Sequence, residues 1–349
     1  LNDKNQFEYK NIYSDKLYDL LGNERKPNEP ITKKHMDIAK SVQSVYEEVF
    51  FYLLNQIQQK YKSENLTLSG GCAMNSVANG KIIKYTKFKK IYVSPNPGDA
   101  GGSVGSAAFF LENKLNYKVS VKNYEYLGKS FTNEEISKII NKKNIKQKYF
   151  EKYIDYENLY PIICNKLIND RVVGWFQGKM EFGHRALGNR SILADPRNKK
   201  IKDIVNKAVK FRESFRPFAP AILKDYQNNI MEMPKSRNVY FMERAYKFKK
   251  NWIKKIPGVV HHDNTGRLQT VDRNNNLKFY NLIKYFYKKT DIPVVLNTSF
   301  NLNGDPIVMS PTDAIRTFYS CGLDILIIGD YVIKKNWKKY PKIIFKNSS

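Results

Sequence analysis

Apolar residues recur at every third or fourth position through the first strongly patterned stretch of the chain, residues 32–62. The residues that set this spacing are Ile38, Val42, Val45, Val49, Leu53 and Ile57. A period of this kind places its members on one face of an α-helix. We therefore expect a single long amphipathic helix over residues 32–62.

Two shorter units follow, each with a strand, a glycine turn and a helix. The apolar run 66–68 leads into a Gly-Gly turn and a helix expected at 76–85. The run 91–93 leads into a second glycine-rich turn and a helix of small residues expected at 104–111. A repeated strand–turn–helix unit is typical of α/β proteins that bind nucleotides.

The rest of the chain alternates apolar runs with helical periodicity and predicts a second α/β domain. Residues 113–155 are rich in lysine and weakly patterned, with one helix expected at 133–141. We place the boundary there, near residue 122, between domains 1–122 and 123–349. Strands are expected at 171–176, 219–223, 239–241, 267–271, 293–297 and 325–328. Helices are expected at 157–169, 199–209, 277–288 and 311–319.

Charge and cysteine content narrow the class of protein. The formal net charge is +27, but the lysines are spread along the chain, so we attribute it to overall composition rather than to nucleic-acid binding. Three distant cysteines without a Cys-x-x-Cys disfavour a disulfide framework and favour the cytoplasm. No apolar run reaches membrane-spanning length. No signal-peptide pattern opens the chain. Because it begins at Leu1 rather than Met and its first strand-like run comes late, we expect the later part of a longer protein.

The segment 174–197 carries the densest candidate chemistry. Its apolar strand breaks at a glycine, and Arg185, Arg190 and Arg197 follow among glycines and apolar residues. Guanidinium groups grip phosphate oxygens, and glycines let the backbone approach a ligand. Arginines with apolar neighbours are expected to be partly buried and to need partners. We predict a loop that binds a phosphorylated ligand; a surface loop with solvated arginines is the alternative.

Both glycine turns of the first domain are candidates for holding a nucleotide, because amides at the start of the following helices face an anion. The residues in question are Gly70, Gly71, Asn75, Gly101 and Gly102. Asp99 stands at the start of the second turn, where a carboxylate can hold a metal or cap a helix. A tight turn without a ligand is the alternative for the Gly-Gly pair.

Later segments add basic groups. Lys210 and Arg216 stand beside aromatic residues ahead of an apolar strand and are expected to add charge to the anion site. His261 and His262 are adjacent, and adjacent side chains chelate a metal poorly. Arg267, next to a glycine at the start of a strand, is the better phosphate candidate in that segment.

Asn297 and Ser299 lie at the end of an apolar strand, where their side chains offer hydrogen bonds to phosphate, ribose or a carbonyl; a plain turn would explain them too. The chain has four histidines, with no Ser-His-Asp order and no His-x-x-x-His pair. We therefore expect catalysis by positioning and charge stabilisation rather than by a triad.

Six strings of the sequence, in order, resemble those of the NodU/CmcH-type carbamoyltransferases. They are Gly-Gly-x-Ala-x-Asn at 70–75, Asn-Pro-Gly-Asp-Ala-Gly at 96–101, Gly-Trp-Phe-Gln-Gly-Lys-Met-Glu-Phe-Gly at 174–183, Arg-Ala-Leu-Gly-Asn-Arg-Ser-Ile-Leu-Ala-Asp-Pro-Arg at 185–197, Phe-Arg-Pro-Phe-Ala-Pro at 215–220 and Leu-Asn-Thr-Ser-Phe-Asn at 296–301. Within them His184 stands where the family usually has proline. Ahead of Arg267, Asn264 and Gly266 replace the usual glycine and alanine.

The resemblance implies an α/β enzyme with the C-terminal part of an actin/hexokinase/Hsp70-like domain at 1–122 and a YrdC-like domain at 123–349. Proteins of this family transfer a carbamoyl group to a hydroxyl of a sugar-containing acceptor. The YrdC-like domain is implied to form carbamoyl adenylate from carbamoyl phosphate and ATP. The kinase-like domain, with a metal that is commonly iron, would pass the carbamoyl group to the acceptor.

Matched by motif position, the resemblance also implies roles for single residues. Phosphates would be bound by Arg185, Arg190, Lys210, Arg216, Arg267 and Ser299. The nucleotide would contact Gly70, Gly71, Asn75, Gly101, Gly102 and Asn297. Asp99 would be a metal ligand, with magnesium arriving on ATP. The family's histidine ligands have no counterpart here, which implies a missing N-terminal region or a partner subunit.

Two other functions share part of these features. A tRNA-modifying threonylcarbamoyl enzyme has both folds and would account for the positive charge. An RNA-binding module would also suit the charge, but it would need stripes of aromatic and basic residues on one sheet. The strings at 174–197 and 215–220 favour O-carbamoyl transfer, and they leave the acceptor open.

Overall fold

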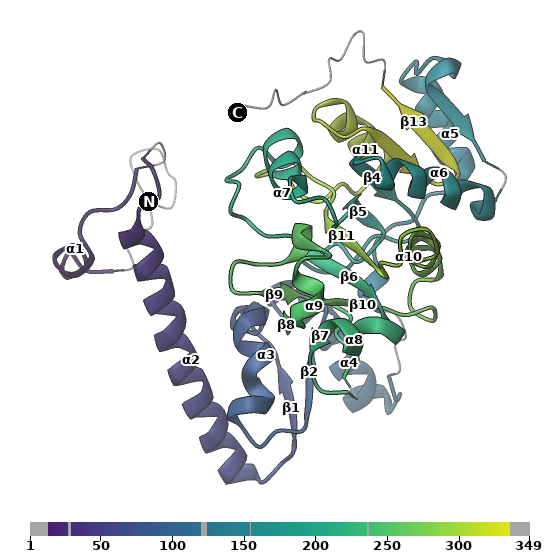
Figure 1. Ribbon diagram of the computed structural model, residues 1–349. Helices are drawn as coiled ribbons and strands as arrows, with labels where there is room; N and C mark the ends of the chain where they lie inside the picture. Colours follow the sequence, from purple (N-terminus) through teal and green to yellow (C-terminus); the bar gives the residue numbers. More distant parts are fainter. Residues whose placement is uncertain (1–12, 27–28, 120–123, 154, 236, 336–349) are drawn as a thin grey trace, which may run out of the picture. The chain divides into compact units, whose positions relative to one another are not determined.

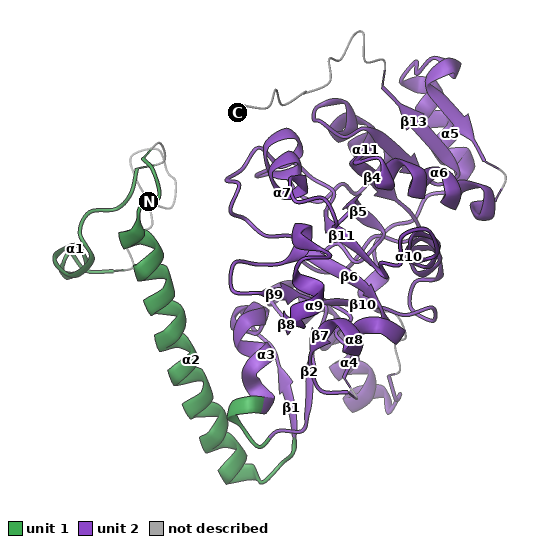
Figure 2. Cartoon of the chain, in the orientation of Figure 1, with its two compact units in different colours: residues 1–64, 84–87 green, residues 65–83, 88–349 purple. Residues whose placement is uncertain are grey.

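The computed structural model describes residues 13–26, 29–119, 124–153, 155–235 and 237–335 (Figure 1). The chain divides into two compact units (Figure 2). Unit 1 contains residues 1–64 and 84–87, and unit 2 contains residues 65–83 and 88–349. The boundary expected near residue 122 lies outside the described residues and stays a prediction.

Unit 1 is built on α1 (Lys16–Leu21) and α2 (Lys33–Tyr61). The expected long helix is confirmed. It begins where the backbone N–H of Thr32 donates to Nδ1 of His35 at 3.0 Å, which caps the first turn. It ends at Lys62, which adopts the left-handed conformation with φ 53°.

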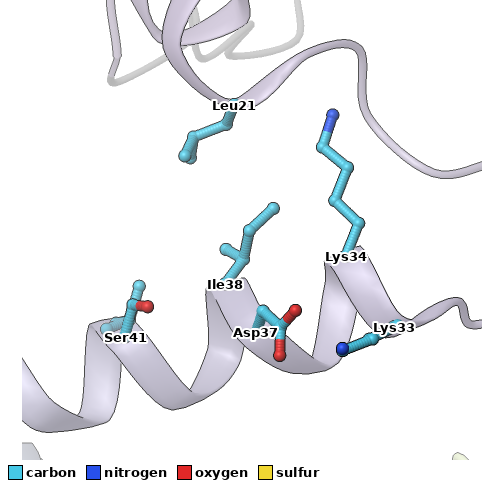
Figure 3. A pocket seen from close by; sticks show the side chains of 7 residues that line it. Leu21, Lys33, Lys34, Asp37, Ile38 and Ser41 are labelled. Atoms are coloured by element: carbon cyan, nitrogen blue, oxygen red, sulfur yellow. The ribbon is translucent and has the colours of Figure 1, made fainter.

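An open pocket of about 500 Å³ lies between α1 and α2 (Figure 3). Leu21 and Ile38 point toward one another across it, and the remaining lining comes mostly from the first turns of α2. None of the predicted site residues lines this pocket. All of the predicted site residues lie instead in unit 2.

Unit 2 begins with the two expected strand–turn–helix units. The elements are β1 (Asn65–Leu68), α3 (Ser76–Tyr85, of which the last two residues belong to unit 1), β2 (Lys90–Val93) and α4 (Gly102–Leu115). β1 and β2 pair in parallel. A Cβ on Gly80 would lie 2.0 Å from the carbonyl oxygen of Ala245, so α3 approaches the strand β8 (Ala245–Phe248) too closely for any side chain there.

The larger part of unit 2 contains an eight-stranded mixed sheet with the order β10-β6-β11-β5-β4-β12-β13-β3. Its strands in chain order are β3 (Phe150–Lys152), β4 (Val173–Phe176), β5 (Arg190–Ala194), β6 (Ala219–Leu223), β10 (Gln269–Val271), β11 (Val294–Ser299), β12 (Ile325–Ile328) and β13 (Tyr331–Lys334). β4 and β12 run parallel, as do β6 and β10, and the other neighbours are antiparallel. Every residue of β4, β5 and β12 is buried, which explains their continuous apolar runs.

A second sheet in this unit has three strands, β7 (Met231–Glu232), β8 (Ala245–Phe248) and β9 (Thr265–Arg267). The helices are α5 (Asn133–Lys142), α6 (Tyr156–Ile168), α7 (Ile201–Ile204), α8 (Gln227–Ile230), α9 (Lys250–Ile253), α10 (Leu277–Thr290) and α11 (Pro311–Tyr319). α6 and α10 pack together and against the large sheet, and α11 contacts β4 and β12. None of the described helices is long and apolar enough to cross a membrane.

Two expectations from the sequence were wrong. Residues 190–194, read as part of a loop, form the central strand β5, because Ile192, Leu193 and Ala194 continue the apolar pattern directly after Arg190. Residues 239–241, read as a strand, are irregular, and the strand in this region is β8. The single strand expected at 267–271 is divided between two strands of different sheets, β9 and β10. The other expected strands and helices of the second half are present, some with shifted ends.

Candidate functional site

The long loop between β4 and β5 lies over the end of the large sheet and is fastened to two of its strands. The side-chain amide of Asn297, on β11, donates to the carbonyl oxygen of Ala186 at 3.0 Å. The amide of Gln269, on β10, donates to that of Leu187 at 2.9 Å. These bonds place the backbone next to Arg185 beside the ends of strands that are distant in sequence.

The interior of this loop depends on close packing. The indole N–H of Trp175 donates to the carbonyl oxygen of Gly188 at 2.7 Å. Gly188 has φ 101°, and a Cβ on it would lie 2.3 Å from the ring of Phe279. Only glycine satisfies both conditions, so this glycine of the arginine-rich motif serves the loop's own shape.

Arg190 is fully buried and faces the protein interior. Its guanidinium carbon lies 3.6 Å from the ring centroid of Phe176, and burial lowers its pKa to about 10. Its terminal nitrogens donate to backbone carbonyl oxygens of Gln177, Asn189, Lys129 and Gly178. This geometry favours a role in holding the loop over direct contact with phosphate, which stays a prediction.

Arg185 and Arg267 form the most distinctive electrostatic feature of the site. Burial lowers the pKa of Arg185. Burial, and then the charge of Arg185, lower the pKa of Arg267 to about 10. Nε of Arg267 donates to Oγ of Ser76 at 3.0 Å, and neither arginine forms an ion pair within the described residues. Two partly buried like charges that repel one another are stabilised when an anion binds beside them.

Lys210 is a second buried cation, and it contacts another predicted residue. It ends a π-helical turn, Val205–Lys210, and its Nζ donates to the carbonyl oxygen of Ser299 at 2.5 Å and to Oδ1 of Asn301 at 2.6 Å. Oγ of Ser299 lies 3.2 Å from the same Nζ. Burial lowers the pKa of Lys210 to about 7. The structure thus joins Lys210 and Ser299, which the sequence places 89 positions apart.

The other basic residues of that motif lie closer to solvent. Nε of Arg216 is 2.8 Å from Oε2 of Glu213, and both side chains are nearly half exposed. Nε of Arg212 instead donates to Oδ1 of Asn206 at 2.8 Å. Arg216 is therefore a group at the rim, free to exchange a weak surface ion pair for a ligand.

The glycine turns of the first domain adjoin the arginine loop. The backbone N–H of Gly70 donates to the carbonyl oxygen of Pro97 at 2.7 Å, which ties the first turn to the second. A Cβ on Gly183 would lie 2.3 Å from the carbonyl oxygen of Pro95, which ties the second turn to the loop. Gly101 is equally required, because a Cβ there would lie 2.0 Å from the carbonyl oxygen of Asn96.

The remaining candidates of these turns are Gly71, Asn75 and Gly102. Gly71 and Gly102 have open space where a side chain would stand, which leaves their backbone accessible to a ligand. Oδ1 of Asn75 accepts from the backbone N–H of Ala78 at 3.2 Å and so supports the start of α3.

A narrow pocket lies where the two turns and the arginine loop meet. Its lining includes Met74 and Pro97 from the turns and His184 and Arg185 from the loop. Its volume of about 20 Å³ is enough for water but not for a nucleotide. The structure therefore gathers three separate motifs of the sequence around one small space.

The segment 241–243 completes that pocket and was not predicted from the sequence. Met242 adopts φ 58°, an uncommon conformation for a methionine. Oε2 of Glu243 accepts from the backbone N–H of Phe241 at 2.9 Å, and burial raises the pKa of this carboxyl group. Without a glycine or a charge cluster, nothing in the sequence marks this turn.

Asp99, the predicted metal ligand, is exposed at the start of a short 3₁₀ helix, Asp99–Gly101. Among the described residues, no three His, Cys, Asp or Glu side chains are grouped closely enough to hold a metal ion. The residues present thus do not by themselves fit a bound metal, and we derive no step through one.

Two partly buried arginines and a buried lysine, none in an ion pair within the described residues, lie in a mixed α/β unit, an arrangement that favours an anionic ligand. Residues 2–108 match the family model described as Carbamoyltransferase N-terminus, and residues 164–335 match Carbamoyltransferase C-terminus. The chain belongs to the carbamoyltransferase family.

The relatives that match this chain include nodulation proteins and uncharacterized proteins. An uncharacterized protein of Synechocystis is 38% identical over 92% of this chain and 56% of its own length. Nodulation protein NolNO of Sinorhizobium fredii is 36% identical over 89% of this chain and 46% of its own length. Nodulation protein NolO of Bradyrhizobium diazoefficiens is 36% identical over 89% of this chain and 57% of its own length. The chain therefore spans about half the length of these relatives.

Proposed function

We propose that this chain forms carbamoyl adenylate from ATP and carbamoyl phosphate, as part of an enzyme that carbamoylates a hydroxyl of a sugar-containing acceptor. In this proposal the large mixed sheet is the YrdC-like domain, and β1–α4 is part of the kinase-like domain. The observation that carries the proposal is the pair Arg185 and Arg267, two partly buried cations that interact electrostatically and have no acidic partner among the described residues.

The reaction requires several negative charges in one place. Carbamoyl phosphate is hydrolysed to phosphate and carbamate, and an oxygen of carbamate then attacks the α-phosphorus of ATP. The new P–O bond forms as the bond to the β-phosphate breaks and pyrophosphate leaves. Fixed cations in a site with little water lower the barrier to such a step, because they stabilise the charge that spreads over the phosphate oxygens.

Each candidate residue of this chain would contribute to the adenylation step according to where it lies. Arg185 and Arg267 would bind the phosphate oxygens directly. Lys210 would be held by Ser299 and Asn301 while it donates to the ligand, and binding an anion would restore the charge that burial disfavours. Arg216 would close the site from the rim. Asn297, whose Oδ1 is buried without a partner among the described residues, would support the loop and contact the nucleotide.

The first domain would complete the transfer. Gly70, Gly71, Asn75, Gly101 and Gly102 would face a nucleotide, and Asp99 would supply one ligand to a metal whose other ligands come from further polypeptide. The unpaired edges of β1 and β2 support this need, because a two-stranded sheet rarely stands alone.

Exchange of labelled pyrophosphate into ATP tests the adenylation step. We expect exchange that depends on carbamoyl phosphate, and Arg185→Ala should reduce it on the order of 100-fold. Arg316→Ala is the matched control, because that arginine is 68% exposed on α11 and should leave the rate unchanged. Absence of exchange in the unaltered chain would contradict the proposal.

The net charge of +27 favours a second candidate, a tRNA-modifying threonylcarbamoyl enzyme. Such an enzyme would bind RNA with an affinity that falls steeply as salt rises. Tight RNA binding of this kind, together with pyrophosphate exchange that responds to bicarbonate and threonine instead of carbamoyl phosphate, would favour it over O-carbamoyl transfer.

A further inference from the structure

One carboxylate holds the loop that carries Arg185. Oε1 of Glu181 accepts three backbone N–H groups, from Leu187 at 2.7 Å, Asn189 at 2.8 Å and Arg190 at 3.1 Å. The Glu181 side chain is 4% exposed, and its Oε2 has no partner among the described residues. Within the described residues, the Glu181 carboxylate therefore accepts hydrogen bonds from this loop alone.

These bonds act on the backbone directly after Arg185. The carbonyl oxygens of Ala186 and Leu187 are held by Asn297 and Gln269, while the N–H of Leu187 is held by Glu181. Both sides of the peptide chain next to Arg185 are thus fixed. The Arg185 guanidinium itself makes no hydrogen bond within the described residues, so the backbone is what determines where it points.

We propose that Glu181 is a positioning residue for Arg185, an inference that rests on the proposed function of that arginine. Its carboxylate would keep the loop ordered before the ligand arrives, so that Arg185 meets a phosphate without an added cost of ordering. Hydrogen bonds from N–H groups to a charged acceptor are stronger than those to a neutral one. Loss of the charge should therefore loosen the loop even where the side chain keeps its shape.

An alternative role for Glu181 predicts the opposite change in ATP affinity. A carboxylate near an anion site repels the ligand, so a glutamate that acted through charge alone would weaken binding. Glu181→Gln would then bind ATP more tightly than the unaltered chain. Positioning predicts weaker binding, by about tenfold for the loss of roughly one charge-assisted contact.

Hydrogen exchange on the full chain tests the positioning directly. In Glu181→Gln we expect faster exchange of the amides of Leu187, Asn189 and Arg190. The control is Glu125→Gln, because Glu125 is also 4% exposed and its carboxylate makes no bond to this loop. Unchanged exchange in Glu181→Gln would overturn the proposal whether or not the chain binds ATP.

A double-mutant cycle on ATP affinity, measured calorimetrically, separates positioning from general stability. If Glu181 acts through Arg185, Glu181→Gln should weaken ATP binding about tenfold alone and less than about twofold when Arg185→Ala is already present. Equal losses on both backgrounds would overturn the inference. Glu181→Asp, which keeps the charge but shortens the reach, should also weaken binding and serves if the Gln variant folds poorly. Failure of the unaltered chain to bind ATP would count against the proposed function, while the exchange measurement still decides the role of Glu181.

Discussion

The segment from α2 to α4 and the large sheet of unit 2 bury their apolar residues very differently. Of the 29 residues of α2, only Leu54 is buried, and α4 has no buried residue although it contains Phe109, Phe110 and Leu115. In the large sheet, every residue of β4, β5 and β12 is buried. α2 and α4 thus leave most of their apolar side chains exposed, whereas the strands of the large sheet form a buried core.

This difference indicates which part of the chain has the core it needs to fold on its own. A helix in water gains most of its stability from packing its apolar face, and α2 has little such packing within unit 1, where it buries only Leu54 and sets Phe51 against Tyr85. Curated relatives are about twice as long as the matched region, so further polypeptide exists in the family that could cover these faces. The residues that we assign to adenylation belong instead to the region that has its own core.

The largest effect is expected from a matched pair of valine substitutions. Val294→Ala, at a fully buried position of β11, should lower the free energy of unfolding by about 2 kcal/mol. Val45→Ala, at a position 60% exposed on α2, should change it by less than about 0.5 kcal/mol. Denaturant titration of both variants measures the difference. Equal losses would mean that α2 has a partner within this chain, and the contrast between the regions would fail.

A second prediction concerns the charge of Lys210. Because burial lowers its pKa to about 7, the unfolded chain binds more protons than the folded one between about pH 7 and 10. Stability should therefore rise with pH over this window, and Lys210→Met should remove that rise. Anion affinity should move the other way, because only the protonated lysine attracts phosphate.

Calorimetry in buffers with different heats of ionisation checks this prediction at pH 8. ATP binding should take up protons in the unaltered chain and not in Lys210→Met. Proton uptake that persists in the variant would assign the titration to another group. It would leave Lys210 as a structural residue that Ser299 and Asn301 hold in place.

The local pattern of apolar and polar residues was sufficient to predict most of the helices and strands. Continuous apolar runs predicted β4, β6, β11 and β12, because strands covered on both faces have no polar alternation. β5 was missed because its first residue is Arg190, and a charged residue usually ends a strand pattern. The burial of that arginine depends on the ring of Phe176 and on distant carbonyl oxygens, which a linear pattern does not contain.

The candidate site shows the same limit. Residue types and sequence motifs selected Lys210, Ser299, Arg185 and Arg267. Only the folded structure joins Lys210 to Ser299 and brings the charge of Arg185 to bear on Arg267. Glu181 had no distinguishing signal, since its hydrogen bonds go to backbone amides that every residue has. The turn at 241–243 was missed for the same reason.

The smallest effect comes from removing one helix cap in each region. Asp155 caps α6 by accepting the backbone N–H of Asn158 at 2.8 Å, and Asp155→Ala should cost about 1 kcal/mol of global stability. His35 caps α2 by accepting the backbone N–H of Thr32, but α2 buries only Leu54. His35→Ala should therefore speed hydrogen exchange in the first turns of α2 and leave the melting temperature of the chain within about 1 °C, against a drop of a few degrees for Asp155→Ala. An equal drop in both variants would mean that α2 unfolds together with the sheet, so that the two regions share one cooperative transition despite their different cores.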